Sequence, residues 1–420
     1  MSFVGFPLSA LFLGLGTLLI GNGLLSLLLS LKAGQAFGET VTGIVMGGYF
    51  LGFVAGSFLV PRIVRSVGYI RTFAALAALA SVVAVAHGVV LDPAAWLVFR
   101  VLSGICLAGI YLVVESWINA QSSNAQRGRV FALYMTVTLA ALGLGLLLGP
   151  LAGSSASVEP FVLASVLFTL GLIPVAVTPM PQPEPPAVPV SRPGRLFAVS
   201  PTGFFGAAIA GLVNGVLWGL GPVFWRGLGL TEAEAGQFMA LVIAGGVVLQ
   251  WPIGHFSDGR DRRWVLGGVC LAAAAAALLT LIAIELSRVW LAACAFAYGG
   301  FMLTVYSLSV AHVNDRASPT EVVEAARTLL LLYGVGAAIG PMLAGVLLES
   351  FGPTTLPVFS AVLLLSLAGV ALQQVLTKDR VAFEEQVTFV PLTRTSPVAL
   401  DVLPEAGIPA SQGTGTERSG

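Results

Sequence analysis

Residues 9–31 read SALFLGLGTLLIGNGLLSLLLSL and contain no charged side chain. A helix that crosses the apolar part of a bilayer needs about 20 such residues, so this stretch predicts a transmembrane helix. No basic segment precedes it, and no clear small-residue cleavage site follows it, as a signal peptide would require. We therefore expect the first helix to remain in the mature protein.

The whole chain has the composition of this first stretch. Of its 420 residues, 57% are hydrophobic and only 10% are charged, against about 25% in an average soluble domain. So few charges could not cover the surface of water-soluble domains, which excludes a soluble enzyme. The 20 basic and 20 acidic residues balance, so no nucleic-acid partner is indicated. The three cysteines lie in apolar stretches and imply no disulfide.

Apolar runs of similar length recur along the chain. Twelve candidate spans lie between turn or charge signals, at 9–31, 41–60, 70–91, 94–118, 130–152, 160–178, 201–225, 235–254, 264–286, 289–312, 325–348 and 353–376. Strand-like alternation is missing from them, so a β-barrel is disfavoured. The sequence predicts an all-α integral membrane protein with twelve transmembrane helices.

The basic residues predict the orientation. Sixteen of the 20 fall in the even-numbered connections and the tail, three fall in the odd connections, and Arg100 lies inside a span. Cytoplasmic loops carry the excess of Lys and Arg, so both termini are expected in the cytoplasm. Lys32, which follows the first span, points the other way locally, and the global count outweighs it.

Two polar segments divide the chain. Residues 179–200 contain seven prolines, which favour an extended linker and interrupt helices. The sequence after Lys378 is rich in Thr, Ser, Gly and Pro and predicts a disordered cytoplasmic tail. We therefore expect six-helix bundles over 1–178 and 201–376, with the linker between them and the tail over 377–420.

The two predicted bundles share an internal repeat. Asn22-Gly23-Leu24-Leu25 matches Asn214-Gly215-Val216-Leu217 at an offset of 192 residues, and two further patterns match at an offset of 191. These are Gly109-x-x-Leu-x-Val-x-Ser with Gly300-x-x-Leu-x-Val-x-Ser, and Gly145-x-x-x-Gly-Pro with Gly336-x-x-x-Gly-Pro. A duplicated unit on each side of a linker predicts two bundles that rock around a midplane site.

One loop carries a resemblance to a known family. Residues 254–263 read GHFSDGRDRR, which resembles the G-x-x-x-D-x-x-x-R-R loop signature of the major facilitator superfamily. The corresponding first-half loop departs from the signature, because Val60 stands where the aspartate is expected and basic residues are displaced to Arg62, Arg65 and Arg71. This departure puts the usual first-half gate in doubt.

Two helix motifs extend the resemblance across spans 1 to 12. Leu97-x-x-Arg100-x-x-x-Gly104 resembles the superfamily's fourth-helix motif. Gly145-x-x-x-Gly149-Pro150-x-x-Gly153 resembles the fifth-helix motif associated with drug and proton antiporters. The resemblance implies a transporter whose central pathway is lined by helices 1, 4, 7 and 10.

Arg100 and Glu115 are charges within one predicted span, where an ionised group costs about 2.5 to 3.5 kcal/mol. They lie about 22 Å apart along the helix and cannot pair with each other. With Gly104, Tyr111 and Asn119 they form one helical stripe, which predicts a helix lining an aqueous path.

Each of the two charges has two interpretations. Arg100 either anchors an anion or tunes proton transfer, or it snorkels to the outer interface beside Trp96. Glu115 either carries a proton or cation, or it is a structural gate residue within reach of Arg127, Arg129 and the basic loop after span 2.

The repeat places Asn22 and Asn214 at equivalent positions deep in spans 1 and 7. Trp218 follows one turn after Asn214. Span 10 presents Tyr298, Met302, Ser309 and His312 along one stripe, with Tyr306 beside it. Together these side chains predict a cavity suited to an amphipathic organic molecule. Ordinary helix packing and interhelical hydrogen bonds are the alternative for each of them.

The loop charges predict a gate on the cytoplasmic side. Asp258, Arg262 and Arg263 can pair with neighbouring helix ends in one conformation only. We expect Arg62, Arg65, Arg127 and Arg129 to contribute from the first half. Gly145, Gly149, Pro150 and Gly153 are expected to allow close helix packing and a bend rather than to bind anything.

These patterns favour one function over two others. A Walker loop, an H-E-x-x-H pair and a G-x-S-x-G motif are missing from the sequence, and the three histidines are too scattered for a metal site. We expect no enzyme activity, no cofactor and no metal. The leading hypothesis is a monomeric secondary transporter of a bacterial inner membrane that exports a small organic compound by proton coupling. The alternatives are an uncoupled or importing facilitator, and a transport-fold sensor or scaffold whose tail recruits a cytoplasmic partner.

Overall fold

The computed structural model describes residues 6–122, 126–179, 183, 192–318, 321–377, 386 and 389. The first half of the chain forms five helices. They are α1 (Phe6–Val67), α2 (Tyr69–Val89), α3 (Pro93–Gln121), α4 (Arg127–Ala152) and α5 (Glu159–Val177).

The second half forms eight helices. They are α6 (Pro193–Val199), α7 (Pro201–Gly227), α8 (Glu232–Ser257), α9 (Arg262–Leu286), α10 (Arg288–Met302), α11 (Thr304–Asn314), α12 (Val322–Phe351) and α13 (Thr355–Thr377). Local capping fixes several helix starts. For example, the Asp92 carboxylate accepts a hydrogen bond from the Ala95 amide, and Thr231 and Glu234 form a capping box.

Helix α1 contains the first two predicted spans. Its backbone leaves the helical conformation at Gly38, where φ is 78° and ψ is 173°, a combination that glycine adopts without steric cost. Eleven helical segments of the described chain are long and apolar enough to cross a membrane, with α1 counted once and α10 and α11 counted together. Since α1 doubles back at Gly38, the chain has the predicted twelve spans. The predicted fold class is confirmed.

The tenth span and the linker differ from their predictions. Leu303 interrupts the predicted span 289–312 and separates α10 from α11, with φ and ψ of −67° and −17° that keep the two helices nearly in line. Residues Pro193–Val199 of the predicted extended linker form α6. The extended prediction is wrong for these seven residues, because Pro193 stands at the helix start, where the missing N–H costs nothing.

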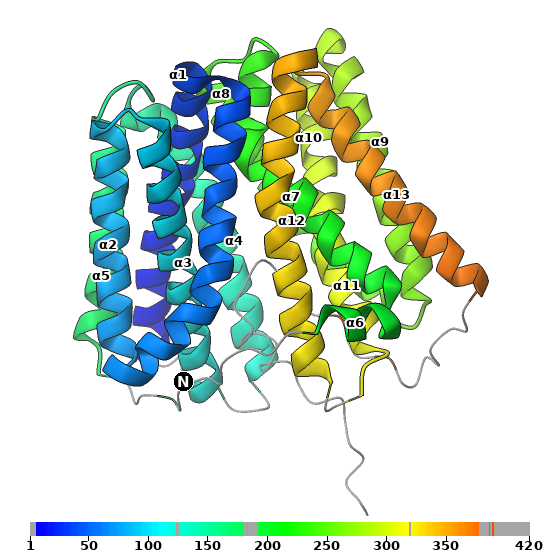
Figure 1. The fold of residues 1–420 in the computed structure, drawn as a ribbon, viewed down its shortest axis with the longest axis horizontal. Coiled ribbons are helices and arrows are strands. Elements are labelled where there is room, and N and C mark those ends of the chain that lie inside the picture. The colour runs from blue at the N-terminus through cyan, green and yellow to red at the C-terminus, as the bar shows by residue number, and fades with distance from the viewer. Residues whose placement is uncertain are drawn as a thin grey trace, which may run out of the picture.

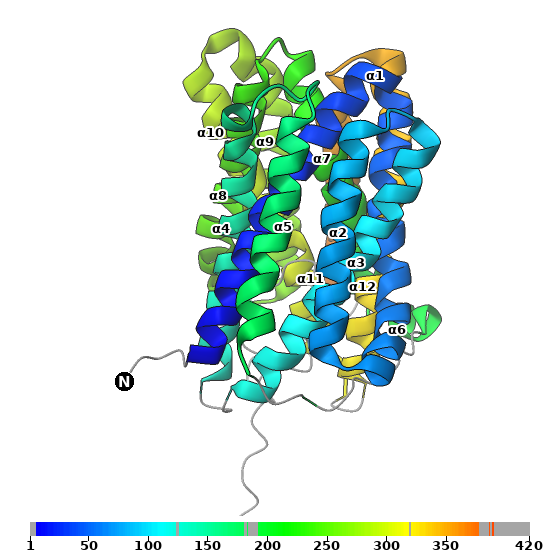
Figure 2. The same cartoon turned by 90° about the vertical axis from the view of Figure 1, so that its left-hand side faces the viewer.

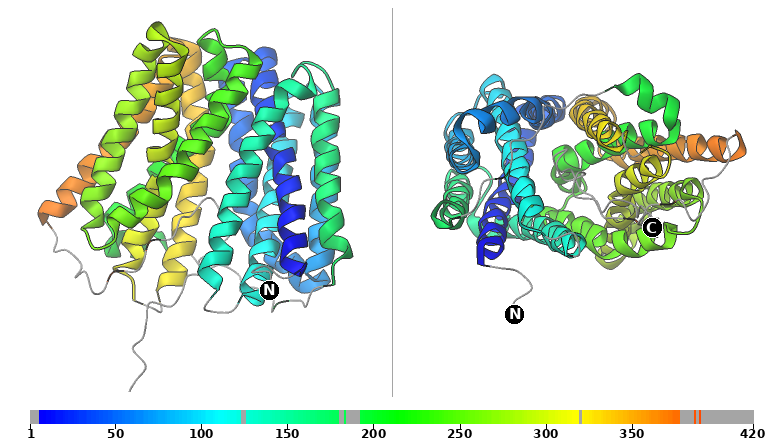
Figure 3. Two further views of the ribbon diagram at one scale, coloured as in Figure 1. Left: turned by 180° about the vertical axis from the view of Figure 1, so that it is seen from behind. Right: turned by 90° about the horizontal axis from the view of Figure 1, so that it is seen from below.

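The two halves form two bundles that lie side by side (Figure 1). From the end that carries the N-terminus, they are seen as separate clusters of helices (Figure 3, right). The loop Gly254–Arg263 lies at this end, which we call the motif face. The turn at Gly38 lies at the opposite end, which we call the closed face. In a side view, α1 passes behind α5 from the motif face to the closed face (Figure 2).

Glycines allow close contacts within each bundle. A Cβ atom on Gly145 of α4 would lie 2.1 Å from the Ile20 carbonyl oxygen of α1, and one on Gly336 of α12 would lie 2.4 Å from the Ala208 carbonyl oxygen of α7. The two halves of the repeat therefore use the same glycine position to pack one helix against the first helix of their bundle.

Candidate functional site

A cavity with an empty volume of about 500 Å³ lies between the two bundles. The first half contributes side chains of α3 and α4, and the second half contributes side chains of α7, α8, α11 and α12 together with Leu303. The lining residues are Tyr111, Thr138, Leu139, Leu142, Asn214, Trp218, Gln250, Leu303, Tyr306 and Tyr333. Four predicted pathway residues, namely Tyr111, Asn214, Trp218 and Tyr306, are therefore brought together here.

Uncharged polar groups and aromatic rings dominate the wall of this cavity. The Gln250 Nε2 donates a hydrogen bond to the Ser307 hydroxyl at 2.6 Å, and the rings of Tyr306 and Tyr333 lie 4.8 Å apart. The Asn214 Nδ2 lies 3.6 Å from the Met302 sulfur. Amide and hydroxyl groups can orient a ligand by hydrogen bonds, and aromatic rings can stack on an apolar or planar part of it.

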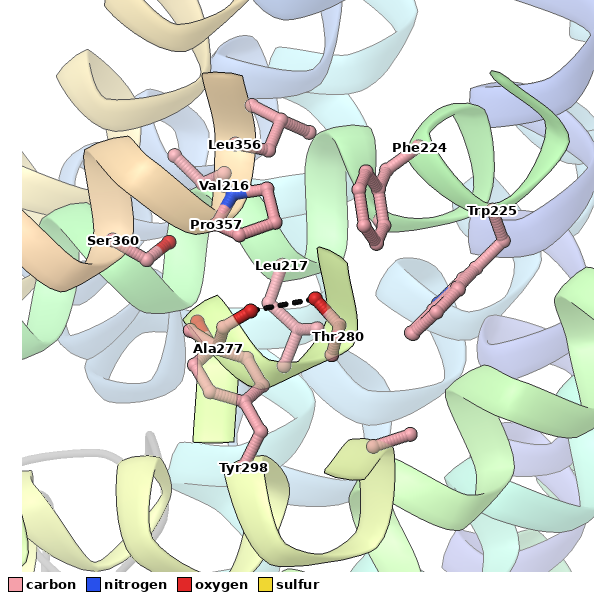
Figure 4. A pocket seen from close by; sticks show the side chains of 12 residues that line it. Val216, Leu217, Phe224, Trp225, Ala277, Thr280, Tyr298, Leu356, Pro357 and Ser360 are labelled. Carbon is pink, nitrogen blue, oxygen red and sulfur yellow. Dashed lines mark hydrogen bonds between the residues drawn. The ribbon is translucent and has the colours of Figure 1, made fainter. Parts of the chain in front are cut away.

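Tyr298 lies in a different pocket, inside the second bundle. This pocket has an empty volume of about 460 Å³, and α7, α9, α10 and α13 line it. Figure 4 shows the ring of Tyr298 below Ala277 and Thr280, with Phe224 and Trp225 across the pocket. Tyr306, which was predicted beside the stripe of span 10, therefore faces the central cavity, whereas Tyr298 of the stripe does not.

Asn22 does not line the central cavity. It is 1% exposed, and its Nδ2 has no hydrogen-bond partner within the described part of the chain. Asn214, at the equivalent position of the repeat, does line the cavity. The two halves therefore use the repeated asparagine differently.

Arg100 is buried inside the first bundle. Its side chain lies over the ring of Tyr49, with 4.7 Å between the guanidinium carbon and the ring centroid, and only 3% of the residue is exposed. Trp96 is fully buried and donates its indole N–H to the Val90 carbonyl oxygen. The snorkelling interpretation of Arg100 is therefore wrong. Gly104 of the same stripe also packs against Tyr49, so this part of α3 faces α1, and the lining of the cavity includes only Tyr111 from the stripe.

Glu115 is fully buried between α3 and α4. Its Oε1 accepts a hydrogen bond from the Tyr134 hydroxyl at 2.6 Å. A carboxylate removed from water needs such donors, because an uncompensated buried charge costs several kcal/mol. Glu115 lies one helical turn from Tyr111, so this pair adjoins the cavity without lining it.

The predicted first-half cations whose side chains the structure describes are far more exposed than this pair. Arg62, Arg65 and Arg129 are exposed, whereas Glu115 is fully buried. The side chain of Arg127 lies outside the described part of the chain. The Tyr134 hydroxyl is a donor to Glu115 Oε1.

Arg262 connects three elements at the motif face. Its side chain is 1% exposed, and its Nε lies 2.7 Å from Asp315 Oδ2, at the end of α11. Its Nη2 lies 3.2 Å from Asp258, and its Nη1 donates to the Ser257 hydroxyl at the end of α8. These contacts join α8, α9 and α11 within the second bundle.

Arg263 pairs with Asp261 rather than with Asp258. Its Nη2 lies 2.7 Å from Asp261 Oδ2, and its Nη1 donates to the Gln374 carbonyl oxygen near the end of α13. Burial raises the pKa of Asp261, but the hydrogen bonds and positive charge of Arg263 outweigh it and leave the pKa below its usual value. Asp261 is therefore a fixed negative charge at the start of α9, where the helix dipole favours it.

Direct contacts join the two bundles at the closed face. Glu232 of α8 accepts hydrogen bonds from the side chain of Gln35 and from both the amide and the hydroxyl of Ser155. Glu349 of α12 accepts one from the Thr40 amide. The contacts are on the side of the cavity opposite the motif face, so the cavity is sealed on that side.

The comparison with protein families decides the identity of this architecture. A model described as Major Facilitator Superfamily matches residues 11–201 and 203–403. The chain belongs to the major facilitator superfamily. The resemblance carried by the loop and helix motifs is thereby confirmed.

Relatives and solved structures of the major facilitator superfamily agree with this assignment. The chain is 28% identical over 360 residues to the uncharacterized MFS-type transporter YcaD of Salmonella typhi, covering 85% of this chain and 92% of the relative. A bacterial homolog of the human lysosomal transporter Spinster, in an inward-facing and occupied conformation, has the same fold. Its TM-score is 0.71 at 18% identity, over 90% of this chain and 97% of the other. The nucleoside transporter NupG has a TM-score of 0.71 at 13% identity, over 89% and 100% of the two chains.

Sequence reasoning missed several residues of this major facilitator superfamily chain. Gln250, Thr138 and Tyr333 line the cavity, and Glu232 and Glu349 connect the bundles at the closed face. The one sequence signal that could have found Gln250 is that it is one of two amides in the apolar run 235–254, the other being Gln237 near its start.

The predicted glycine motif of this superfamily member lies in α4. Gly145 and Gly149 pack on α1, where added Cβ atoms would lie 2.1 and 2.5 Å from its atoms. Pro150 is exposed near the end of α4, and Gly153 ends the helix with φ of 115°. These positions contact neither the cavity nor the motif-face loop.

Proposed function

We propose that this chain transports a small, uncharged, amphipathic organic compound by alternating access. The observation that carries the proposal is the cavity between the bundles, which is lined from both halves by amides, hydroxyls and aromatic rings and sealed at one end. A rocking motion of the two bundles would expose such a cavity to each side in turn.

Three further observations support the orientation, the membrane and the monomeric state that we propose. The distribution of the 20 basic residues supports cytoplasmic termini, so the motif face would open to the cytoplasm. The bacterial relatives support a bacterial inner membrane. One chain holds a complete cavity, which supports a monomer as the transporting unit.

Proton coupling is proposed at the Glu115–Tyr134 pair. A buried carboxyl group that adjoins the cavity can take up and release a proton as the two faces alternate. In this mechanism the proton gradient drives export of the organic compound. The hydrogen bond from Tyr134 would hold the carboxyl group in place in the open-motif-face state.

An uncoupled facilitator is the second candidate. Among the described residues, the lining of the cavity includes no Asp, Glu, Lys, Arg or His. A ligand bound there would therefore have no direct contact with a titrating side chain. Counterflow that is equally fast with and without a pH gradient is the result that favours this candidate.

The cavity predicts which compounds bind and which substitution abolishes binding. In a thermal-shift screen of the purified protein, we expect stabilisation by a neutral ring compound such as uridine rather than by tetraphenylphosphonium or benzoate. Gln250→Leu should lower proteoliposome uptake of the stabilising compound at least about tenfold, because a ligand hydrogen bond in a closed site is worth about 1.5 kcal/mol.

Gln373→Leu is the matched control, since Gln373 is exposed on α13. Uptake in this variant should equal that of the wild-type protein. Stabilisation only by the charged probes, or full uptake by Gln250→Leu, would contradict the proposed cavity chemistry.

A further inference from the structure

Two residues of the C-terminal tail contact the motif-face loop. The Gln386 Nε2 donates to the Arg260 carbonyl oxygen at 2.9 Å, and the Gly259 amide donates to Gln386 Oε1 at 3.1 Å. The Phe389 amide donates to Asp258 Oδ1 at 3.0 Å. The tail is thus held to the loop by one side-chain amide that both donates and accepts, and by one charge-assisted hydrogen bond.

The Phe389 side chain packs on α8. It is 7% exposed, and a Cβ atom on Gly254 would lie 2.0 Å from its ring. Gly254 follows Gly236 by 18 residues, which is five full turns of an α-helix, so the two glycines share one face of α8. At Gly236 this face lies against α4, because a Cβ atom there would lie 2.6 Å from the Leu146 carbonyl oxygen.

Helix α4, which faces α8, has two positions with the same 18-residue spacing. In α4, Gly128 precedes Leu146 by 18 residues and therefore shares its face. Since α4 and α8 run in opposite directions, Gly128 is the residue that corresponds to Gly254. Among the described residues, a Cβ atom on Gly128 would meet nothing within 4 Å. The two helices thus touch at the closed face and separate toward the motif face, where Phe389 covers the face of α8 that α4 leaves open.

We propose that Phe389 is an autoinhibitory wedge that holds the motif face open by occupying the α8 surface on which α4 must close. This inference rests on the proposed alternating access. When the motif face closes, Gly254 and Gly128 must approach as closely as Gly236 and Leu146 do, and an aromatic ring cannot remain between them. Closing therefore requires the tail to leave α8 and the Asp258 carboxylate.

The wedge predicts a conformational shift that does not depend on a transported compound. Spin labels on Ser66→Cys of α1 and Gln373→Cys of α13, with the native cysteines replaced by alanine, report the separation of the bundles at the motif face of the full chain in liposomes. We expect a long distance in the otherwise wild-type protein. Phe389→Ala, and truncation after Thr377, should each raise the ratio of short to long distances about tenfold, because a buried aromatic contact exists in only one of the two states.

Matched variants separate the wedge from other effects of the tail. Phe351→Ala makes the same substitution at a phenylalanine of α12 that is 73% exposed and should leave the distances unchanged, whereas Gln386→Ala should produce a smaller shift in the same direction. Unchanged distances in both Phe389→Ala and the truncated protein would overturn the wedge, as would an equal shift in Phe351→Ala. Failure of the proposed function would instead be seen as full uptake by Gln250→Leu, with the distance shift of Phe389→Ala still present.

Discussion

At the scale of single residues, the buried carboxyl group of Glu115 carries an energetic cost. It is fully buried beside the Tyr134 hydroxyl, and burial of this kind is costly for an ionised group. The proposed proton coupling would give this cost a function, because the protonation of Glu115 would change between states.

Glu115→Gln tests this role directly. We expect the variant to lose stimulation of uptake by an imposed pH gradient while it retains counterflow, because glutamine preserves the shape and hydrogen bonding of the carboxyl group but cannot titrate. Glu159→Gln, at an exposed carboxyl group, should keep the full stimulation. A gradient response that persists in Glu115→Gln would assign Glu115 a structural role.

Only some of the residues that line the cavity could be predicted from the sequence. Charge within an apolar span drew attention to Arg100 and Glu115, but a charge indicates an energetic cost and not a location. Glu115 packs beside the cavity rather than in its wall, and Arg100 packs against Tyr49 inside the first bundle. Gln250 was missed because isolated amides in an apolar helix give no periodic signal. Asn214 was found because the repeat singled it out, although the same repeat also selected Asn22, which does not line the cavity.

At the scale of helices, the closed face depends on backbone contacts between α1 and α12. A Cβ atom on Gly43 would lie 2.0 Å from the Pro341 carbonyl oxygen, and one on Gly47 would lie 2.5 Å from that of Ala338. The twelve spans were predictable because a bilayer fixes their length. The break at Leu303 and the helix α6 were not, because neither alters the hydrophobic pattern.

Gly43→Ala should therefore weaken the closed face. We expect a lower midpoint of thermal unfolding in detergent, by several degrees, because the added methyl group forces α1 and α12 apart. Gly369→Ala is the control, since a Cβ atom there meets nothing within 4 Å. It should be neutral or slightly stabilising, as alanine favours helix more than glycine does. Equal midpoints for Gly43→Ala and the wild-type protein would show that this contact does not hold the face.

At the scale of the whole molecule, the structure combines two bundles, one sealed end and a cavity between them. The repeat and the linker predicted this division, and the family assignment supports a transporter. The sequence could not predict which end is sealed, because the hydrophobic pattern locates the helices and not the contacts between the bundles. That choice depends on contacts such as those of Glu232, which form only when both bundles are folded and docked.

The most direct test of alternating access is a pair of distances measured in the same protein. Spin labels on Ala36→Cys and Ser350→Cys report the closed face, and labels on Ser66→Cys and Gln373→Cys report the motif face. On addition of the compound that stabilises the protein in the thermal-shift screen, we predict that a population appears in which the closed-face distance lengthens and the motif-face distance shortens. Two distances that stay fixed, or that change in the same direction, would contradict alternating access.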